Sequence, residues 1–314
     1  MIKKPKFWDN NSLSFLSIIL LPFTIPLRIN NFFLNFNSKT KRKEIFSICV
    51  GNIYVGGTGK TPTTIKLFQI LRKINRSTVT AKKFYKAHND EAKLLNKKTN
   101  FITGLNRLEI INKAVNKKKE IIIFDDGLQD RRVEYNLKFA CFNASNWIGN
   151  GHLIPSGPLR ENLSSLKKFD AVFLKDIKNS NRKISSIIKK INPKIKIFYS
   201  KYKINNLKNF NLSKKYVVFS GIGNHETFLD MLKKNKFKIL EDFEYPDHYN
   251  YSIDDLNKIR LYAKKYNAKI LTTEKDFLRI KSEDQKNIQY VSVNLKIKQI
   301  EKLKETLDLI NENN

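Results

Sequence analysis

The hydrophobic residues of this 314-residue chain fall into short continuous runs that alternate with longer amphipathic segments. Continuous apolar runs bounded by polar residues are typical of strands buried on both faces, and the amphipathic segments have the period of a helix. Buried strands are expected at 44–50, 77–81, 120–126, 137–143, 170–174 and 195–199. Helices are expected at 62–74, 89–97 and 181–191. This alternation predicts an α/β fold with a mostly parallel sheet that carries helices on both faces.

The second part of the chain shows the same alternation after a polar stretch at 201–215, which has the composition of a connector. Strands are expected at 216–221, 268–273 and 288–293, and helices at 224–235, 252–265 and 297–311. Ser252 and Asp255 have the spacing of a capping box at the start of one of these helices. We therefore expect an N-terminal segment at 1–40, a larger domain at 41–203 and a second, smaller α/β domain at 204–314.

The N-terminal segment is strongly apolar between residues 12 and 27, but it does not read as a spanning helix or a signal peptide. A spanning helix needs about 20 apolar residues. This run is broken by Pro22 and Pro26, and no small-residue cleavage site follows it. Phe7 and Trp8 precede it and basic residues flank it, which predicts a helix lying in a membrane interface. A helix packed on the core would share the same amphipathic pattern, so both interpretations stay open.

The chain is strongly basic, with 60 Lys and Arg residues against 29 Asp and Glu residues and a formal net charge of +31. Such a charge favours polyanionic partners such as nucleic acid, an anionic membrane or phosphorylated substrates, although lysine is abundant throughout the sequence and general compositional drift explains it equally well. Cys49 and Cys141 lie in apolar runs without disulfide or metal spacing, which is typical of a reducing compartment.

The stretch "GNIYVGGTGKTP" at 51–62 has the features of a phosphate-binding loop. It follows an expected strand and precedes an expected helix, and its glycines can turn backbone N–H groups toward an anion at the helix N-terminus. Gly56, Gly57, Thr58 and Gly59 would form the loop, Lys60 would reach the β- and γ-phosphates, and Thr61 would ligate Mg²⁺. Tyr54 occupies the position of the outermost glycine in the usual pattern.

A second motif supports the assignment of the loop. The strand expected at 120–126 ends in Asp125 and Asp126, and a carboxylate at the end of such a strand is what a Walker-B site requires to meet the Mg²⁺ held by Thr61. Adjacent residues of a strand point to opposite sides, so one carboxylate would face the metal and the other a neighbouring group. An isolated Asp-Asp-Gly is otherwise a turn signal.

Together with these motifs, further segments make the chain similar to the tetraacyldisaccharide 4′-kinases, the lipid A 4′-kinases of Gram-negative bacteria. The resemblance extends from the N-terminal apolar segment to about residue 293. Its other segments are "NDEA" (89–92), "GNGHLIPSGPLREN" (149–162), "SGIGNHETF" (220–228), "YPDHYNYSIDDL" (245–256) and "LTTEKDFLRI" (271–280).

The resemblance implies a fold, an activity and a location. The fold is a P-loop NTPase-like α/β/α domain with a mostly parallel sheet, a second smaller α/β domain that closes over the active site, and an N-terminal interfacial helix. The activity is transfer of the γ-phosphate of ATP, with Mg²⁺, to the 4′-hydroxyl of a tetraacylated glucosamine disaccharide 1-phosphate. The enzyme would act as a peripheral or monotopic protein on the anionic surface of the inner membrane, at its cytoplasmic face, and no nucleic-acid partner is expected.

The resemblance also implies roles for individual residues. Asp90 matches the acidic motif that supplies the family's base, and His248 matches a histidine from the second domain that pairs with it; Lys60 completes the catalytic set. The pair would form or tighten when the domains close. The metal set comprises Thr61, Asp125, Asp126 and Glu91, and the expected contacts to substrate or phosphate come from Gln129, Arg160 and Glu161.

Three segments depart from the family pattern. "TAKKFYK" at 80–86 replaces a Ser-Arg-Gly-Tyr-Gly element, so an arginine has no clear counterpart. Lys82, Lys83 or Lys86 can replace its charge but not its bidentate geometry. "NDEA" replaces Gly-Asp-Glu-Pro, and "VEYNLKF" at 133–139 replaces a segment that normally carries Arg-Asp.

Two other classes of protein are weighed against this interpretation. A ParA/MinD-like ATPase shares the glycine-rich loop but typically has a lysine just before the paired glycines, where this chain has Val55. A nucleic-acid-binding module would place basic and aromatic residues on one face, whereas the lysines here are spread over both halves without a recognisable motif.

Overall fold

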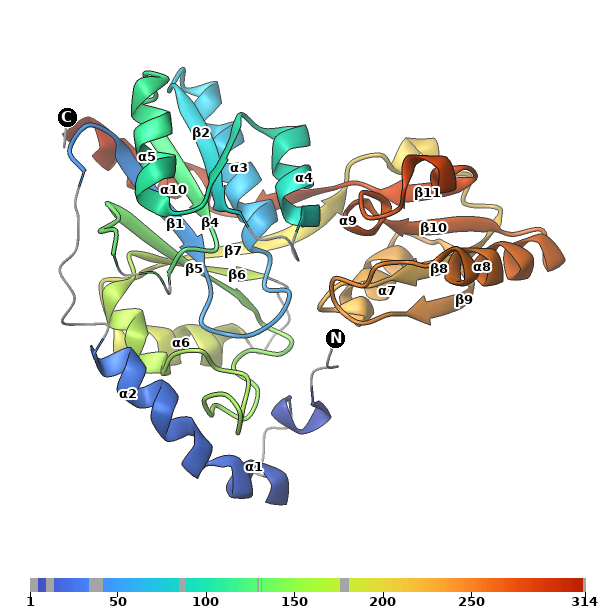
Figure 1. The fold of residues 1–314 in the computed structure, drawn as a ribbon, viewed down its shortest axis with the longest axis horizontal. Coiled ribbons are helices and arrows are strands. Elements are labelled where there is room, and N and C mark those ends of the chain that lie inside the picture. The colour runs from blue at the N-terminus through green and yellow to red at the C-terminus, as the bar shows by residue number, and fades with distance from the viewer. Residues whose placement is uncertain are drawn as a thin grey trace. The chain divides into compact units, whose positions relative to one another are not determined.

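The computed structural model describes residues 5–9, 14–33, 42–84, 89–128, 130, 132–175 and 181–312. The chain forms two compact units (Figure 1). The larger unit comprises 4–84, 98–201 and 295–314, and the smaller unit contains 85–97 and 202–294.

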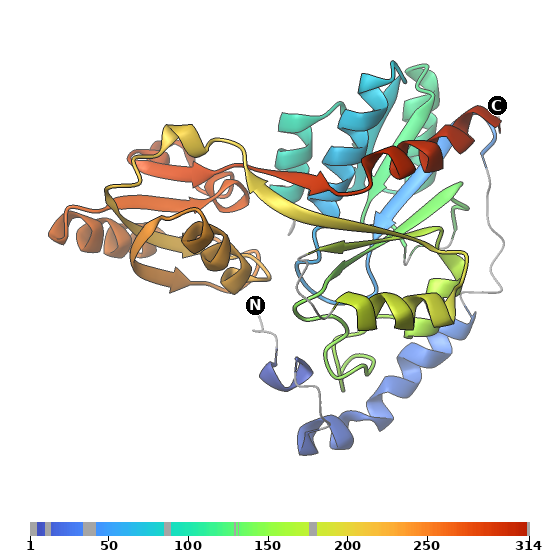
Figure 2. The same ribbon diagram turned by 180° about the vertical axis from the view of Figure 1, so that it is seen from behind.

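The larger unit is built on an eight-stranded sheet in the order β12-β7-β6-β5-β1-β4-β2-β3. Its strands are β1 (Phe46–Gly51), β2 (Thr78–Lys83), β3 (Phe101–Gly104), β4 (Ile121–Asp125), β5 (Leu137–Asn143), β6 (Ala171–Lys175), β7 (Lys196–Ile204) and β12 (Val293–Ile297). The ladders from β3 through to β7 are parallel. β12 lies beside β7 at the edge of the sheet (Figure 2).

Helices cover the central strands of this sheet. α5 (Arg107–Asn116) and α6 (Asn181–Ile191) contribute to one core cluster with side chains such as Cys49 and Phe124. α3 (Lys60–Lys73) packs on β1, β2 and β4, and α10 (Ile300–Glu312) follows β12. β1 and β4 are buried at every position, which explains why their sequences read as continuous apolar runs.

The smaller unit has a four-stranded parallel sheet in the order β11-β10-β8-β9. Its strands are β8 (Lys215–Ser220), β9 (Lys238–Glu244), β10 (Lys269–Thr273) and β11 (Ile288–Val291). α7 (His225–Lys234) and α8 (Ile253–Lys265) contribute to two separate core clusters, one on each face. The unit also includes most of α4 (Asn89–Lys98) and the one-turn helix α9 (Glu274–Phe277).

The α/β fold with a mostly parallel sheet and a second smaller sheet is confirmed. The capping box of Ser252 and Asp255 is present, and both cysteines are buried and free. β3, α5 and β9 were not predicted, and β7 continues into the stretch expected to be a connector. The expected boundary also differs from the structure, because α4 groups with the smaller unit and residues 295–314 group with the larger one.

The N-terminal segment forms α1 (Phe15–Leu20), a short 3-10 turn and α2 (Ile25–Phe33). Pro22 and Pro26 fall in the first turns of their helical segments, where a missing N–H group is tolerated. Among the residues the structure describes, no helix is long and apolar enough to cross a membrane.

Candidate active site

The glycine-rich loop connects β1 to α3 in the larger unit. Gly56 and Gly59 have φ angles of +127° and +91°, which side chains disfavour, so glycine is required at both positions. Gly59 precedes the first residue of α3, and Lys60 and Thr61 open the helix. The N-terminus of α3 and the backbone of the loop thus provide an arrangement that suits a phosphate group.

The side chain of Asn52 holds the loop through hydrogen bonds. Its side chain is fully buried, and its amide nitrogen donates to the carbonyl of Tyr54 at 2.5 Å and to the hydroxyl of Thr58 at 2.9 Å. Lys60 Nζ donates to the side-chain oxygen of Asn52, Oδ1, at 3.4 Å. No role was predicted for Asn52, whose only local signal is its position between a buried strand and the glycines.

Tyr54, at the position of the usual outer glycine, is buried in a small apolar cluster. It is only 4% exposed and clusters with Leu153 and Leu159, while its hydroxyl donates to Asp9 at 2.5 Å. The backbone N–H of Arg160 donates to the carbonyl of Ile53 at 2.7 Å, so the "GPLREN" segment runs beside the start of the loop.

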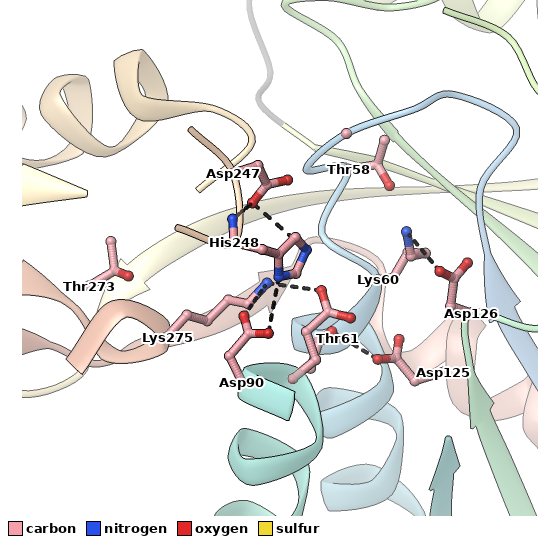
Figure 3. Close-up of polar contacts among 12 residues, drawn as sticks. Thr58, Lys60, Thr61, Asp90, Asp125, Asp126, Asp247, His248, Thr273 and Lys275 are labelled. Carbon is pink, nitrogen blue, oxygen red and sulfur yellow. Dashed lines mark hydrogen bonds and ion pairs between the residues drawn. The ribbon is translucent and has the colours of Figure 1, made fainter. Parts of the chain in front are cut away.

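Asp125 ends β4 and lies beside Thr61 (Figure 3). The Thr61 hydroxyl donates to Asp125 Oδ2 at 2.9 Å, and Lys82 Nζ lies 3.2 Å from the same oxygen. A hydroxyl and a carboxylate are oxygen donors of the kind that Mg²⁺ prefers, and nucleotide phosphates and water complete such sites. Among the described residues, no group of three or more His, Cys, Asp or Glu side chains could hold a metal ion.

Asp126 faces a different set of groups, as expected for adjacent residues at a strand end. Its carboxylate lies 3.6 Å from Lys60 Nζ and 3.6 Å from a guanidinium nitrogen of Arg160. Its backbone has a φ of +63°, and its carbonyl accepts a hydrogen bond from Arg107 at 2.9 Å. Aspartate is one of the few residues other than glycine that adopt this conformation, which is common in tight turns. Arg107 was missed because it lies in α5, which was not predicted.

The smaller unit contains Asp90, in the first turn of α4 (Figure 3). Asp90 is 4% exposed. His248 Nδ1 lies 3.0 Å from Oδ1, while Arg279 donates to Oδ2 at 2.7 Å and Lys275 Nζ lies 3.5 Å from Oδ2. Burial raises the pKa of Asp90, but the hydrogen bond from His248 and the charges of Lys275 and Arg279 outweigh it and hold the pKa well below its ordinary value. The carboxylate is therefore ionised.

His248 is positioned by an unusual backbone conformation. Its φ is +59°, and its backbone N–H donates to the carbonyl of Gly221 at 3.0 Å. Left-handed backbone in a residue other than glycine costs energy and persists only where the surroundings enforce it, often at functional sites. The "PDH" segment is thus fixed against the end of β8, and its imidazole is aimed at Asp90.

α4 is held to the rest of the smaller unit by several contacts with α9 and its surroundings. Lys93 donates to the carbonyl of Leu278 at 3.0 Å, and Lys97 lies 3.2 Å from the carboxylate of Glu274. Asp90 and His248 therefore belong to the same unit. This differs from the expectation that they lie on separate domains and that the pair forms or tightens when the domains close.

The remaining predicted residues are placed as follows. Glu91 lies 2.9 Å from Lys275 in the smaller unit, and its assignment as a metal ligand stays a prediction. Glu161 is buried in the larger unit, next to Arg160. Gln129 lies outside the described residues. Lys275 and Arg279 were not assigned a role, although both lie within "LTTEKDFLRI".

A strand, a glycine-rich loop ending in Lys-Thr and a buried aspartate on the neighbouring strand define a P-loop nucleotide-binding protein. The sequence model of the tetraacyldisaccharide-1-P 4′-kinase family matches residues 13–311. The chain belongs to this family.

Individual relatives agree with this assignment. The chain is 48% identical over its full length to tetraacyldisaccharide 4′-kinase of Pelagibacter ubique, with 99% of that protein covered. It is 31% identical to the enzyme of the same name from Rickettsia akari, with 96% of each chain covered. A crystal structure of LpxK from Aquifex aeolicus in complex with ATP superposes with a TM-score of 0.70 at 23% identity, covering 94% of this chain and 99% of the other, which supports the fold.

Proposed function

We propose that this protein is an ATP-dependent kinase that phosphorylates the 4′-hydroxyl of a tetraacylated glucosamine disaccharide 1-phosphate in lipid A biosynthesis. The observation that carries the proposal is membership of the family along nearly the whole chain, joined to a phosphate loop and a buried carboxylate in the arrangement that a Mg²⁺-nucleotide requires.

Residues of the larger unit would bind the nucleotide. The backbone of residues 56–59 and the N-terminus of α3 would surround the phosphates, and Lys60 would reach the β- and γ-phosphates after leaving Asp126. Thr61 and Asp125 would hold Mg²⁺, which neutralises phosphate charge during transfer. Arg160, beside Asp126, would add positive charge near the transferred group.

Residues of the smaller unit would accept the proton of the sugar hydroxyl. Asp90 is ionised and held from both sides by His248 and Arg279, so its position does not depend on the substrate. A weakly basic carboxylate coupled to an imidazole can orient the hydroxyl and take up its proton as the phosphoryl group arrives. Transfer requires this pair and the nucleotide loop to act on the same substrate, so we include closure of the smaller unit over the active site in the proposal.

The N-terminal helices support a membrane location. Phe15, Phe23 and Phe33 are 76%, 64% and 63% exposed, whereas Ser17 and Thr24 are buried. The backbone carbonyl of Ser17 accepts a hydrogen bond from the hydroxyl of Ser156 at 2.7 Å. A helix packed on a core in water would bury its apolar face, and this arrangement is the reverse.

We infer that these helices lie in the anionic surface of the inner membrane, on its cytoplasmic side, as a peripheral or monotopic anchor. The basic charge of the chain supports such a surface and an anionic glycolipid substrate.

The test is transfer of labelled γ-phosphate from ATP to a tetraacyl disaccharide 1-phosphate in detergent micelles with Mg²⁺. The wild type should label the lipid, Asp90→Ala should not, and Asp230→Ala, which changes an exposed aspartate of α7, should behave as the wild type. No labelled lipid, together with ATP hydrolysis stimulated by vesicles or DNA, would instead support an ATPase switch.

A further inference from the structure

Lys82 is a buried cation at the nucleotide site that the roles described above do not use. It lies near the end of β2, which runs parallel to β4 with Ala81 opposite Phe124. Lys82 and Asp125 are the next residues of the two strands and are therefore neighbours. The Lys82 side chain is 5% exposed and that of Asp125 is fully buried, and the two charged atoms are 3.2 Å apart. Lysines are almost never buried to this depth unless they are paired.

The position of Lys82 distinguishes it from its neighbour in the sequence. Side chains of successive strand residues point to opposite faces, so Lys83 cannot share its environment. Lys83 is also less buried. Lysines in this segment were expected to replace the charge of a missing arginine. In the structure, Lys82 is the lysine that contacts the Walker-B carboxylate of Asp125.

The contact uses the oxygen that the proposed metal site would use. Asp125 Oδ2 accepts the hydroxyl of Thr61 at 2.9 Å as well as the ammonium of Lys82 at 3.2 Å. A metal ion bound between Thr61 and Asp125 would lie close to this ammonium group. The positive charges of the metal ion and of the Lys82 ammonium group would repel one another strongly, because water screens charges less inside a protein.

We propose that Lys82 is a resident counter-cation of Asp125, which neutralises the carboxylate in the metal-free protein and competes with Mg²⁺ for it. The inference rests on the proposed function of the Thr61–Asp125 pair as the Mg²⁺ site. Lys82 thereby stabilises the metal-free protein and raises the concentration of metal at which the nucleotide complex forms. In this proposal Lys82 acts through Asp125 and is therefore a positioning residue.

The experiment measures Mn²⁺ binding to the full-length protein in the presence of ADP, by electron paramagnetic resonance of the free ion. Lys82→Met removes the charge, Lys82→Gln removes the charge but keeps an N–H donor, and Lys83→Met is the neighbouring control. We expect Kd for Mn²⁺ to fall on the order of tenfold in both Lys82 variants, because a repulsive unit charge has been removed from a buried divalent site. Lys83→Met should leave Kd unchanged.

A second readout is the thermal stability of the protein without metal or nucleotide. Lys82→Met should lower Tm, and adding Asp125→Asn should restore much of the loss, because the buried charge that lost its partner is then gone. If Lys82→Met does not fold, Lys82→Gln carries the metal measurement.

Two results would overturn the proposal. One is a Kd for Mn²⁺ that is unchanged or weaker in the folded Lys82 variants. The other is a loss of ADP affinity with no change in metal affinity, which would indicate that Lys82 contacts phosphate. Neither readout uses the lipid acceptor, so a failure to phosphorylate lipid would count against the proposed function and leave the metal result intact.

Discussion

The contact between Arg279 and Asp90 allows a quantitative prediction about the stability of the smaller unit. The Arg279 side chain is 5% exposed and donates to Asp90 at 2.7 Å, to Asp276 at 2.7 Å and to the carbonyl of Gly221 at 2.6 Å. The side chains of Asp90 and Asp276 are 3% and 0% exposed. Arg279→Met keeps a long side chain but leaves two buried carboxylates without this cation.

Removing one partner of a buried ion pair costs about 3–5 kcal/mol, because the remaining charge stays out of water. Asp90 keeps Lys275 and His248, and Asp276 keeps the hydroxyl of Tyr251 at 2.8 Å, so we expect a value near the lower end. With a urea m-value of about 1–2 kcal/mol/M for a unit of this size, the midpoint should fall by roughly 2 M.

The two units can be followed separately during urea unfolding. The chain has two tryptophans, Trp8 and Trp147, and both belong to the larger unit. Most tyrosines belong to the smaller unit, so near-ultraviolet circular dichroism of tyrosine reports on that unit. Arg279→Met should move the tyrosine transition to lower urea and leave the tryptophan fluorescence transition in place.

Arg260→Met is a matched control in the same unit. Arg260 is half-buried and donates to the carbonyl of Asp284 at 2.6 Å and to Asn257 at 3.1 Å, with no carboxylate among these partners. Its loss should cost about 1 kcal/mol, as for an ordinary hydrogen-bonding side chain. If Arg279→Met shifts the tyrosine transition no more than Arg260→Met, the buried ion cluster does not contribute as we describe.

Three further predictions concern the proposed reaction, pH and the membrane. Asp90→Ala and His248→Ala should each lower kcat by roughly a hundredfold or more in steady-state kinetics, while nucleotide titration should show nearly unchanged ATP affinity. The double variant should lose no more activity than the worse single variant. Independent, multiplicative losses would mean that the two residues do not act as a pair. The pKa of Asp90 is lowered from its ordinary value of 3.8, so its ion cluster stabilises the folded state fully above that pH and progressively less as pH falls through the folded-state pKa. At pH values below about 4, the urea concentration at the midpoint of the tyrosine transition should therefore decrease. The part of this decrease that comes from protonation of Asp90 should be absent in Asp90→Asn. Phe15→Ser with Phe23→Ser should weaken sedimentation with anionic vesicles without changing the urea midpoint, because both side chains are exposed; unaltered vesicle binding would contradict an interfacial role.

The sequence alone determined those features that depend on neighbouring residues. β1 and β4 were predicted because every position is buried, which leaves a continuous apolar run. The loop at 51–62 was predicted because positive φ angles restrict Gly56 and Gly59 to glycine. The capping box at Ser252 was predicted because its hydrogen bonds span only three residues. By contrast, β9 is nowhere fully buried, so its apolar pattern is weak and it was missed.

Only the tertiary structure decided which charges meet. Asp90 is separated by 158 residues from His248 and by 189 residues from Arg279, and no local pattern connects positions so far apart. Lys82 and Lys83 are indistinguishable in the sequence, but pairing of β2 with β4 directs Lys82 to the buried Asp125. The physical reason is that the sequence gives the charge of each side chain, whereas burial and strand register determine which oppositely charged side chain lies beside it.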